Sequence, residues 1–366
     1  MSRSPDVVVV GGGIVGISVA ASCARRGLTV TLCEAAGLAQ AASGRNQGLV
    51  IGPNPPAMEA IGHRTLQLLL DLHERSGGAF AFDREPYGCL MLGGESDDML
   101  TGEALCELEP QLAPGVGPGW INHNARRIDP GTAAAVLADD ARAAGAEIRT
   151  GCAVRELLRN GGDVTGVLTD DGRIEAACVV VAAGPWSWRV CRSLAHDVPV
   201  RGVRGWIIVT RPAPFRLQHV IEEYARTAPA APTLGQLAEG SEPAAHIPCV
   251  LQQDAAGRVL VGASLHGATM EGDEAPETRR AIARRAVEVV PALAGVAIAD
   301  SRSCQRPYSP DGLPLIGPYP GVRGLVLATG HGSLGVTQSL GSGEAVADGL
   351  VEGRWEAALD PARLLA

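Results

Sequence analysis

The chain has 366 residues, of which 46% are hydrophobic and 19% charged, which predicts a globular protein of two domains. Acidic residues outnumber cationic ones by 40 to 31 and no long basic block is present, so we expect no nucleic-acid partner. All 31 cationic residues are arginine, and the absence of lysine excludes a Schiff-base lysine or a lysine general base.

Residues 6–34 predict a strand, a glycine-rich turn, a helix and a second strand. The valine run Val7–Val10 is typical of a strand buried on both faces, as in a parallel sheet. The apolar segment Val7–Ala24 holds four glycines and follows no basic region, so we expect neither a signal peptide nor a transmembrane segment.

Between this strand and helix, Gly11–Gly16 fits the GxGxxG pattern of dinucleotide sites. In that pattern Gly11 permits the tight turn, Gly13 lets a pyrophosphate approach, and Gly16 lets helix and sheet pack closely. The helix N-terminus offers free N–H groups, while Glu34 can accept from ribose hydroxyls and disfavours NADP. A glycine-rich turn without a ligand is the alternative. The candidate nucleotide-binding residues here are Gly11, Gly13, Ile14, Val15, Gly16, Glu34 and Ala35.

Further elements follow in chain order. A break at 54–56 precedes an amphipathic helix at 60–74, and Asp129, followed by Pro130 in the first turn, caps a helix that ends near Ala144. We expect 200–300 to be largely strand-like, with a loop around 228–232 as a cover for the active site. The remaining predicted elements are strands at 87–92, 147–149, 153–158, 178–182 and 325–328, a turn at 170–172, a glycine-rich turn at 330–335 and a helix to about 350.

This order predicts an α/β (α+β) fold in which a Rossmann-like domain is interleaved with a β-rich substrate domain. The nucleotide domain is expected to comprise 1–78, 129–197 and 303–366. The substrate domain is expected to comprise 79–128 and 198–302.

Nine cysteines are present, an odd number without a CxxC pair. This usage is typical of reduced thiols in a cytoplasmic protein and gives no support to a disulfide framework or a metal site. We therefore expect a cytoplasmic location.

Several further strings occur in a fixed order along the chain. They are Ala42–Gly48, Ile128–Pro130, Gly151–Val154, Val181–Ser187, Arg306–Pro307 with Asp311–Gly317, and Thr329–Gly335. Together with the glycine pattern they resemble the D-amino-acid oxidase (DAO) family of FAD-dependent oxidoreductases, which includes glycine oxidase, sarcosine oxidase and D-amino-acid dehydrogenase. The resemblance spans nearly the whole chain.

The resemblance implies an FAD-binding domain, with Val154 near the adenine and with 47–49 and 332–337 along the flavin ring. Backbone N–H groups of Gly332–Val336 at a helix start would face the negative charge of a reduced flavin. A helix entry without a ligand is the alternative for this turn. The FAD-binding residues implied are Ala42, Ser43, Arg45, Asn46, Gln47, Gly48, Leu49, Val154, Ala183, Gly184, Trp186, Gly332, Ser333, Leu334, Gly335, Val336 and Thr337.

The resemblance also implies the reaction: oxidation of the carbon next to an amine by hydride transfer to flavin N5, giving an imine that hydrolyses. The partner is then a small-molecule amine or amino acid, and orientation does most of the work without a side-chain base. Three alternatives stay open: an NAD(P)H-dependent flavin reductase or hydroxylase, the flavin subunit of a multi-component dehydrogenase that passes electrons to a partner protein or quinone, and a noncatalytic FAD-stabilised assembly protein. No second strand–GxGxxG–helix unit supports the first of these.

The substrate end departs from parts of the family. Ser333 stands where glycine oxidase and D-amino-acid oxidase place an arginine, and Thr337 where sarcosine oxidase has a lysine. The string Gly330–Gly335 is most similar to D-amino-acid dehydrogenases and to the related opine and hydroxyproline dehydrogenase subunits.

Candidate catalytic residues are Arg306 and Tyr224, which could hold a substrate carboxylate, with His331 and Ser333 in the final turn. Each has a structural alternative, such as a domain-bridging arginine or a satisfied histidine. Cys304 lies seven residues before Asp311, where sarcosine oxidases carry the cysteine bonded to flavin, so a covalent link and a buried thiol both stay open. Further candidates for an anion site are Arg45, Arg204, Arg226 and Tyr308.

Overall fold

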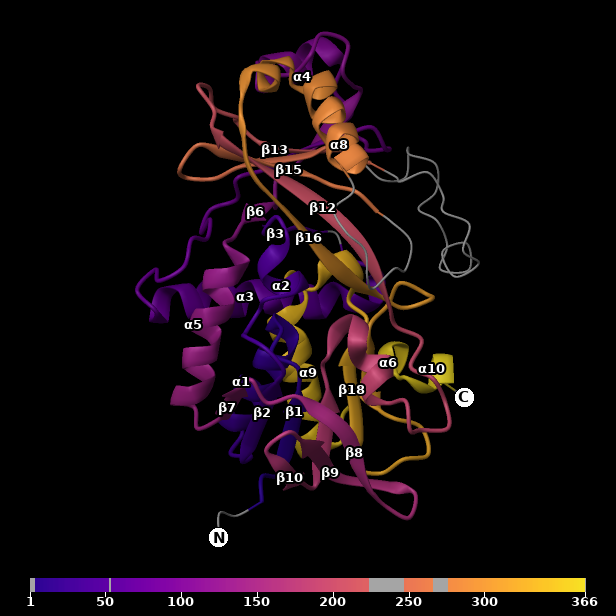
Figure 1. Cartoon of the computed structure of the whole chain (residues 1–366). Coiled ribbons are helices and arrows are strands. Elements are labelled where there is room, and N and C mark those ends of the chain that lie inside the picture. Colours follow the sequence, from indigo (N-terminus) through magenta and orange to yellow (C-terminus); the bar gives the residue numbers. More distant parts are fainter. Residues whose placement is uncertain (1–3, 53, 224–246, 266–275, 366) are drawn as a thin grey trace.

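The computed structural model describes residues 4–52, 54–223, 247–265 and 276–365. Two large sheets dominate it, one of six strands in the lower part of Figure 1 and one of seven strands in the upper part. Helices and strands are mixed throughout, which confirms the predicted α/β (α+β) class. Among the described residues, no helix combines the length and the apolar character needed to cross a membrane.

The six-stranded sheet is assembled from the beginning, middle and end of the chain. All neighbours in it are parallel except β17, which pairs antiparallel with β18 at the edge. Val7 and Val9 face one apolar cluster, whereas Val8 and Val10 face another, so β1 is buried on both faces as predicted. In order across the sheet, the strands are β17 (Leu315–Pro318), β18 (Leu325–Thr329), β11 (Cys178–Val181), β1 (Val7–Val10), β2 (Val30–Glu34) and β7 (Glu147–Thr150).

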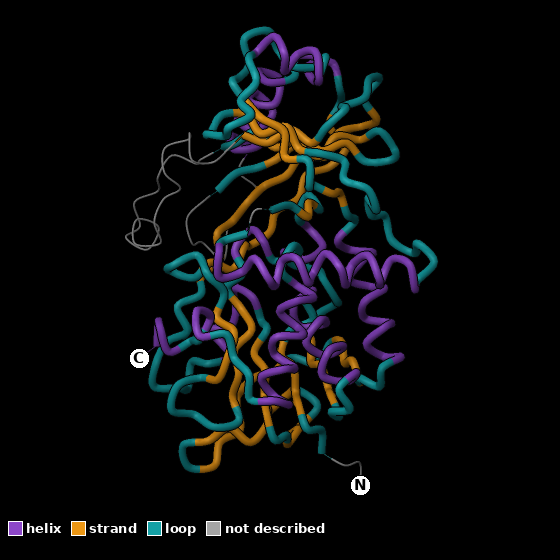
Figure 2. The backbone as a smooth tube through the Cα atoms, turned by 180° about the vertical axis from the view of Figure 1, so that it is seen from behind, coloured by secondary structure: helices purple, strands orange, loops and turns teal. Residues whose placement is uncertain are grey.

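Helices cover one face of this sheet, the longest of them packing on a neighbouring helix (Figure 2), and a three-stranded sheet covers the other face. Helices α1 and α9 touch closely, because a Cβ at Gly343 would lie 2.5 Å from the backbone of Ser18. The Asp129 side chain accepts from the N–H groups of Gly131 and Thr132, which confirms it as the cap of α5. The helices are α1 (Ile14–Arg25), α3 (Glu59–Arg75), α5 (Pro130–Ala143) and α9 (Ser339–Glu352), and the small sheet comprises β8 (Val154–Asn160), β9 (Asp163–Thr169) and β10 (Gly172–Glu175).

In the described residues, the helices that pack on the seven-stranded sheet lie on one face of it. Its outer face packs on α8 (Pro276–Val289), with α4 (Gly102–Leu108) beside it. The expectation that 200–300 is largely strand-like is wrong at α8, where buried Ile282, Ala286 and Val289 recur at helical spacing. The strands, in order, are β16 (Ile298–Tyr308), β12 (Arg201–Pro212), β15 (Arg258–Gly262), β14 (Val250–Gln253), β13 (Val220–Glu223), β4 (Cys89–Leu92) and β5 (Gly119–Asn122).

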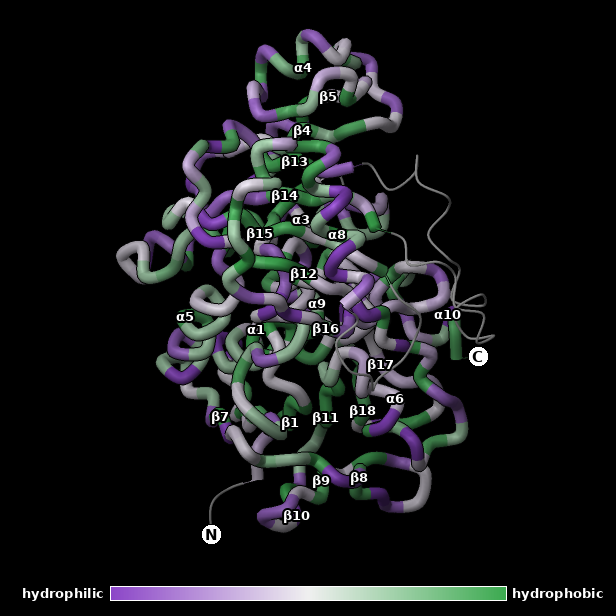
Figure 3. The backbone as a smooth tube through the Cα atoms, turned by 45° about the horizontal axis from the view of Figure 1, so that its top comes forward, coloured by the Kyte–Doolittle hydropathy of each residue, from purple (hydrophilic) through white to green (hydrophobic). Residues whose placement is uncertain are grey.

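Two long strands, β12 and β16, connect the two parts of the molecule (Figure 1). They pair antiparallel from Arg201 opposite Tyr308 to Thr210 opposite Ile298. The boundary expected at 302/303 therefore falls inside β16. Figure 3 shows strands of both large sheets in hydrophobic green, as expected for elements that form the cores.

The remaining short elements refine the prediction. Residues 42–45, the start of the matched string Ala42–Gly48, form a one-turn helix, and the loop expected around 228–232 lies outside the described residues. The turn at 170–172 is confirmed, because β9 ends at Thr169 and β10 begins at Gly172. These elements are α2 (Ala42–Arg45), β3 (Leu49–Val50), η1 (Pro56–Met58), β6 (Arg126–Arg127), η2 (Gly184–Trp186), α6 (Ser187–Val190), η3 (Pro291–Gly295), η4 (Gly332–Leu334), η5 (Ala357–Leu359) and α10 (Ala362–Leu365).

Candidate cofactor and substrate site

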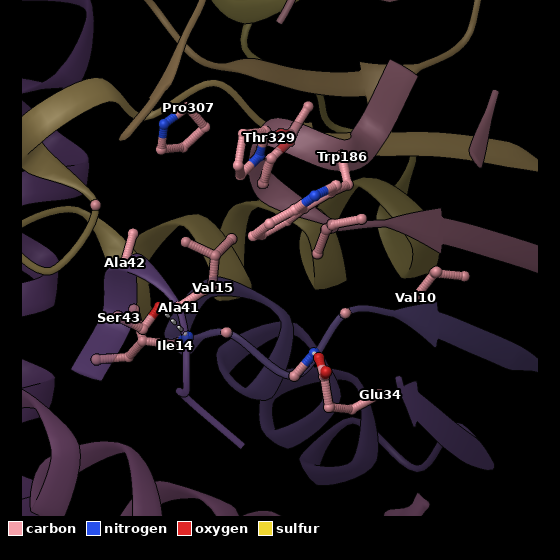
Figure 4. A pocket seen from close by; sticks show the side chains of 18 of the residues that line it. Val10, Ile14, Val15, Glu34, Ala41, Ala42, Ser43, Trp186, Pro307 and Thr329 are labelled. Carbon is pink, nitrogen blue, oxygen red and sulfur yellow. Dashed lines mark hydrogen bonds between the residues drawn. The ribbon is translucent and has the colours of Figure 1, made fainter. Parts of the chain in front are cut away.

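A cavity of about 690 Å³ opens where the predicted motifs converge. Figure 4 shows Glu34 at one end and Pro307 at the other, with Trp186 between them. The volume lies within the range of roughly 300–1,000 Å³ found for small-molecule and cofactor sites. Of the candidate residues, those that line the cavity are Gly11, Gly13, Ile14, Val15, Glu34, Ala35, Ala42, Ser43, Asn46, Val154, Ala183, Gly184, Trp186, Cys304, Arg306, His331, Gly332, Ser333, Gly335 and Val336.

The glycines of the turn at the start of α1 have two different roles. Two of them leave no room for a side chain against the backbone, and one faces the cavity. Gly11 has φ +113°, and a Cβ there would lie 2.5 Å from the carbonyl of Ala182. A Cβ at Gly16 would lie 2.0 Å from the carbonyl of Gly11, whereas one at Gly13 would meet only Ser43 Oγ, at 3.1 Å. Gly13 therefore keeps backbone open to the cavity, which is the space that a pyrophosphate needs.

Two side chains organise this end of the cavity. Ser43 Oγ accepts from the N–H of Ile14 at 2.9 Å, the dashed contact in Figure 4. Glu34 accepts from the N–H of Gly12 at 2.6 Å and from that of Ala36 at 2.8 Å. A carboxylate has about four lone-pair sites, so Glu34 retains capacity for ribose hydroxyl donors. The cradle thus fits the diphosphate and ribose of a dinucleotide.

Three arginines that sequence reasoning missed line the cavity beside Val154: Arg155, Arg189 and Arg192. Arg155 pairs with the exposed Asp170 through two contacts of 2.7 Å. A signal was available, because Arg155 directly follows the matched string 151–154. Arg189 lies in α6, three residues after Trp186, and Arg192 follows the end of that helix by two residues.

The opposite end of the cavity contains the final glycine-rich turn. His331 is buried, and burial lowers the pKa of its imidazole to about 4, so the ring is neutral at pH 7. Its Nε2 lies 3.0 Å from Ser342 Oγ, whose proton is donated to the carbonyl of Gln338 at 2.7 Å. Ser342 must then accept, which assigns the proton of His331 to Nε2. Ser333 Oγ lies 2.7 Å from the hydroxyl of Tyr308.

Arg306 brings a positive charge to this end. Its guanidinium lies over Gly205, where a Cβ would be 1.8 Å from Nη1, and donates to the carbonyl of Ser264 at 3.2 Å. Within the described ranges no carboxylate pairs with it. The absence of a side chain at Gly205 therefore makes room for a cation whose charge is available to an anionic ligand.

Cys304, on the same strand, also lines the cavity. Burial raises the pKa of its thiol, against the opposing effect of Arg306, Arg302 and Arg45. A raised pKa reduces the thiolate fraction that a covalent bond would require. All nine cysteines lie in the described residues, and all nine are free.

Seven candidate residues do not line the cavity. Some of them form hydrogen bonds between the cofactor segment at 47–49 and the seven-stranded sheet. Gln47 Nε2 donates to the carbonyls of Val250 and Leu260 at 2.9 and 3.3 Å. Thr337 Oγ1 lies 3.4 Å from the carbonyl of Leu49. Tyr224 and Arg226 lie outside the described residues. The seven are Gly16, Arg45, Gln47, Gly48, Leu49, Leu334 and Thr337.

Comparisons with known proteins agree with this geometry. Residues 6–349 match the DAO family model, described as FAD dependent oxidoreductase. The chain is 29% identical to a glycine oxidase of Pseudomonas aeruginosa over 98% of both chains, and 29% identical to a D-amino acid dehydrogenase of Allorhizobium ampelinum over 79% of this chain and 63% of that one. The crystal structure of glycine oxidase from Geobacillus kaustophilus superposes with a TM-score of 0.83 at 23% identity, with all of both chains covered. The expected resemblance is confirmed: the chain belongs to the DAO family of FAD-dependent oxidoreductases, and its cofactor is FAD.

Proposed function

We propose that this enzyme oxidises the C–N bond of an amino acid or a related secondary amine. The observation that carries the proposal is Arg306, a cation at the end of the cavity with no acidic partner among the described residues. A guanidinium there would hold a substrate carboxylate by charge-assisted hydrogen bonds and so orient the carbon next to the amine. The relatives named glycine oxidase and D-amino acid dehydrogenase support the same substrate class.

FAD, when bound, supplies the acceptor for the hydride. On this proposal the backbone of Gly13 and Val15 would hold the pyrophosphate, and Ser43, which accepts from the N–H of Ile14, has its own hydroxyl proton left to donate to a phosphate oxygen. Glu34 holds the ribose, and Val154 lies at the adenine. The backbone of Gly332–Val336 would stabilise negative charge at the flavin ring.

The proposal also covers the acceptor that takes electrons from the reduced flavin. We favour a quinone or an electron-accepting partner protein, because Ser333 and Thr337 are uncharged where other family members carry cations. We also propose a cytoplasmic location, which nine free thiols favour. For the domains, we propose that 1–78, 129–197 and 303–366 form the FAD-binding domain and that 79–128 and 198–302 form the substrate domain.

An anaerobic screen of flavin bleaching tests the proposal. D- and L-amino acids, sarcosine, proline analogues and opines would be mixed with the holoenzyme, and we expect at least one to remove the yellow colour of FAD within seconds, a rate on the order of 1 s⁻¹. NADH and NADPH serve as the contrast. Fast bleaching by either nucleotide, with none by any amine, would favour a flavin reductase and overturn the proposal.

A further inference from the structure

Gly205 lies on β12, next to the side chain of Arg306 on the neighbouring strand β16. Because Trp206 packs in the apolar cluster of α8, a side chain at Gly205 would point to the opposite face of the sheet. The residue directly opposite Gly205 on β16 is Cys304, which lines the cavity, whereas Arg306 is opposite Val203. Gly205 is therefore a diagonal neighbour of Arg306, a separation that a long side chain can reach across.

The guanidinium of Arg306 fills the space that a side chain at Gly205 would take. An ideal Cβ at Gly205 would lie 1.8 Å from Nη1, 2.6 Å from Cζ and 2.7 Å from Nη2 of Arg306. Non-bonded heavy atoms pack at about 3.5–4.0 Å, so a side chain at 205 and this guanidinium exclude each other. Gly205 is buried and does not line the cavity, whereas Arg306 does. The guanidinium thus covers the glycine and faces the ligand.

A backbone carbonyl holds the guanidinium in that space. Nη1 of Arg306 donates to the carbonyl oxygen of Ser264 at 3.2 Å. Ser264 is fully buried and is itself tied to β12, because its Oγ accepts from the N–H of Trp206 at 3.0 Å. We call Gly205 and Ser264 the arginine seat, since the first leaves the space and the second supplies the acceptor.

The arginine seat fixes Arg306 without neutralising its charge. A carbonyl carries no net charge, and within the ranges that the structure describes no carboxylate forms an ion pair with Arg306. A guanidinium has five N–H donors, and the bond to Ser264 uses one of them, so donors remain for a ligand. A cation that is already held in place loses less conformational entropy when an anion binds to it. Both the charge and the fixed position therefore favour a carboxylate ligand.

We infer that Gly205 is a specificity-determining residue, which selects substrates with a carboxylate by leaving the space in which Arg306 lies when it faces the cavity. The inference rests on the proposed function, in which Arg306 holds that carboxylate. Gly205 acts through Arg306 and is a positioning residue, because it does not line the cavity itself. A methyl group at position 205 would displace the guanidinium from the arginine seat and remove the preference for amino acids over amines without a carboxylate.

The first test measures carboxylate binding without turnover. Propionate is titrated into the holoenzyme, and its Kd is read from the change in flavin absorbance. We expect Gly205→Ala and Arg306→Met each to raise this Kd about 10-fold or more, and the double variant to raise it no further, because both changes remove the same contact. Gly295→Ala is the matched control, since the same methyl group there meets nothing within 4 Å, and it should leave the Kd unchanged.

A second test removes the clash, so that its result does not depend on whether Gly205→Ala folds. Arg306→Ala empties the arginine seat, and methylguanidinium in the buffer should then lower the Kd of propionate about 10-fold. In the double variant Gly205→Ala/Arg306→Ala the added methyl group occupies the seat. Methylguanidinium should then change the Kd by no more than about 2-fold, because the free cation cannot take the place of the lost guanidinium.

Turnover gives the readout on specificity. The ratio of kcat/KM for an amino acid to that for the corresponding amine without a carboxylate should fall about 10- to 100-fold in Gly205→Ala, with flavin content unchanged. If Gly205→Ala keeps this ratio and the propionate Kd, or if both Arg306→Ala variants respond equally to methylguanidinium, the inference is overturned while the proposed function stands. If no amino acid or amine bleaches the flavin, the proposed function itself fails, and the inference fails with it.

Discussion

The two large sheets differ in what covers them. The six-stranded sheet has helices on one face and a small sheet on the other, so both faces serve stability. The seven-stranded sheet has its described helices on the outer face, and its inner face looks toward the segment 47–51, with Glu222 of β13 beside Met91 and Val250. The first sheet therefore offers a ligand mainly backbone at its turns, whereas the second offers side chains on a strand surface.

The largest effects are expected at the glycine-rich turn of the six-stranded sheet. Two substitutions there should have different results, one on stability and one on FAD binding. Gly16→Val should cost about 3 kcal/mol or more of unfolding free energy, because its Cβ would overlap the carbonyl of Gly11. Gly13→Val should fold, yet lose FAD, because its side chain enters the cavity. Melting temperature and flavin content measure the two outcomes. Gly162→Val, where a Cβ meets nothing within 4 Å, is the control, and full flavin content in Gly13→Val would contradict the assignment.

On the seven-stranded sheet, Arg306→Met should lower kcat/KM for an amino acid about 10³-fold, because loss of a buried charge pair costs about 4 kcal/mol. An amine without a carboxylate should lose no more than about 5-fold, since it makes no such pair. Flavin content checks that the cofactor site is intact. Equal losses for both substrates would assign Arg306 to the cofactor instead.

The charges at the flavin end of the cavity, where the two sheets meet, predict that the reduced flavin reacts slowly with oxygen. A cation beside the flavin favours oxygen reduction, but lysine is absent, Thr337 is neutral, the pKa of His331 is about 4, and on the proposed function Arg306 pairs with the substrate carboxylate. We expect stopped-flow reoxidation in air to be at least about 10-fold slower than turnover with a quinone or dye, a barrier difference of about 1.4 kcal/mol. Recovery in air at the rate of turnover would identify an oxidase.

A smaller effect concerns stability. The pKa of Glu222 is about 7 in the folded protein and 4.5 in the absence of burial, so the folded state binds the proton more tightly. Stability is therefore retained below pH 4.5 and falls as the pH rises to about 7. Glu222→Gln removes this loss and should stabilise the substrate-free holoenzyme by on the order of 1–3 kcal/mol at pH 8, but hardly at pH 4.5. Identical melting temperatures at pH 8 would show that the carboxylate is well solvated.

The smallest effect is expected at Cys304, whose thiol pKa is raised by burial. We predict that acid precipitation releases FAD into the supernatant from both the unmodified enzyme and Cys304→Ser. Colour retained in the pellet of the former and lost from that of the latter would establish a covalent link.

The same difference between the regions explains what the sequence could predict. A site made from backbone needs glycines at fixed offsets, so Gly11–Gly16 and Gly330–Gly335 are visible as strings, and Asp129 is visible as a cap. The neighbours of Glu222 could not be predicted in this way, because Met91 and Val250 come from strands far apart in sequence. Arg306 was found because it adjoins a matched string, not because its lack of an acidic partner could be foreseen.

The ladder of β12 and β16 has a mechanical consequence. Two strands that pair over this length and pass together between the sheets are held to each other by a row of hydrogen bonds, so we expect them to move as a pair. Arg306 and Tyr308 lie two residues apart on one side of this strand pair, and Tyr308 contacts Ser333 in the final turn. Because Tyr308 also forms a bridge with His331, we expect a displacement of Arg306 to shift the turn at 332–334 as well.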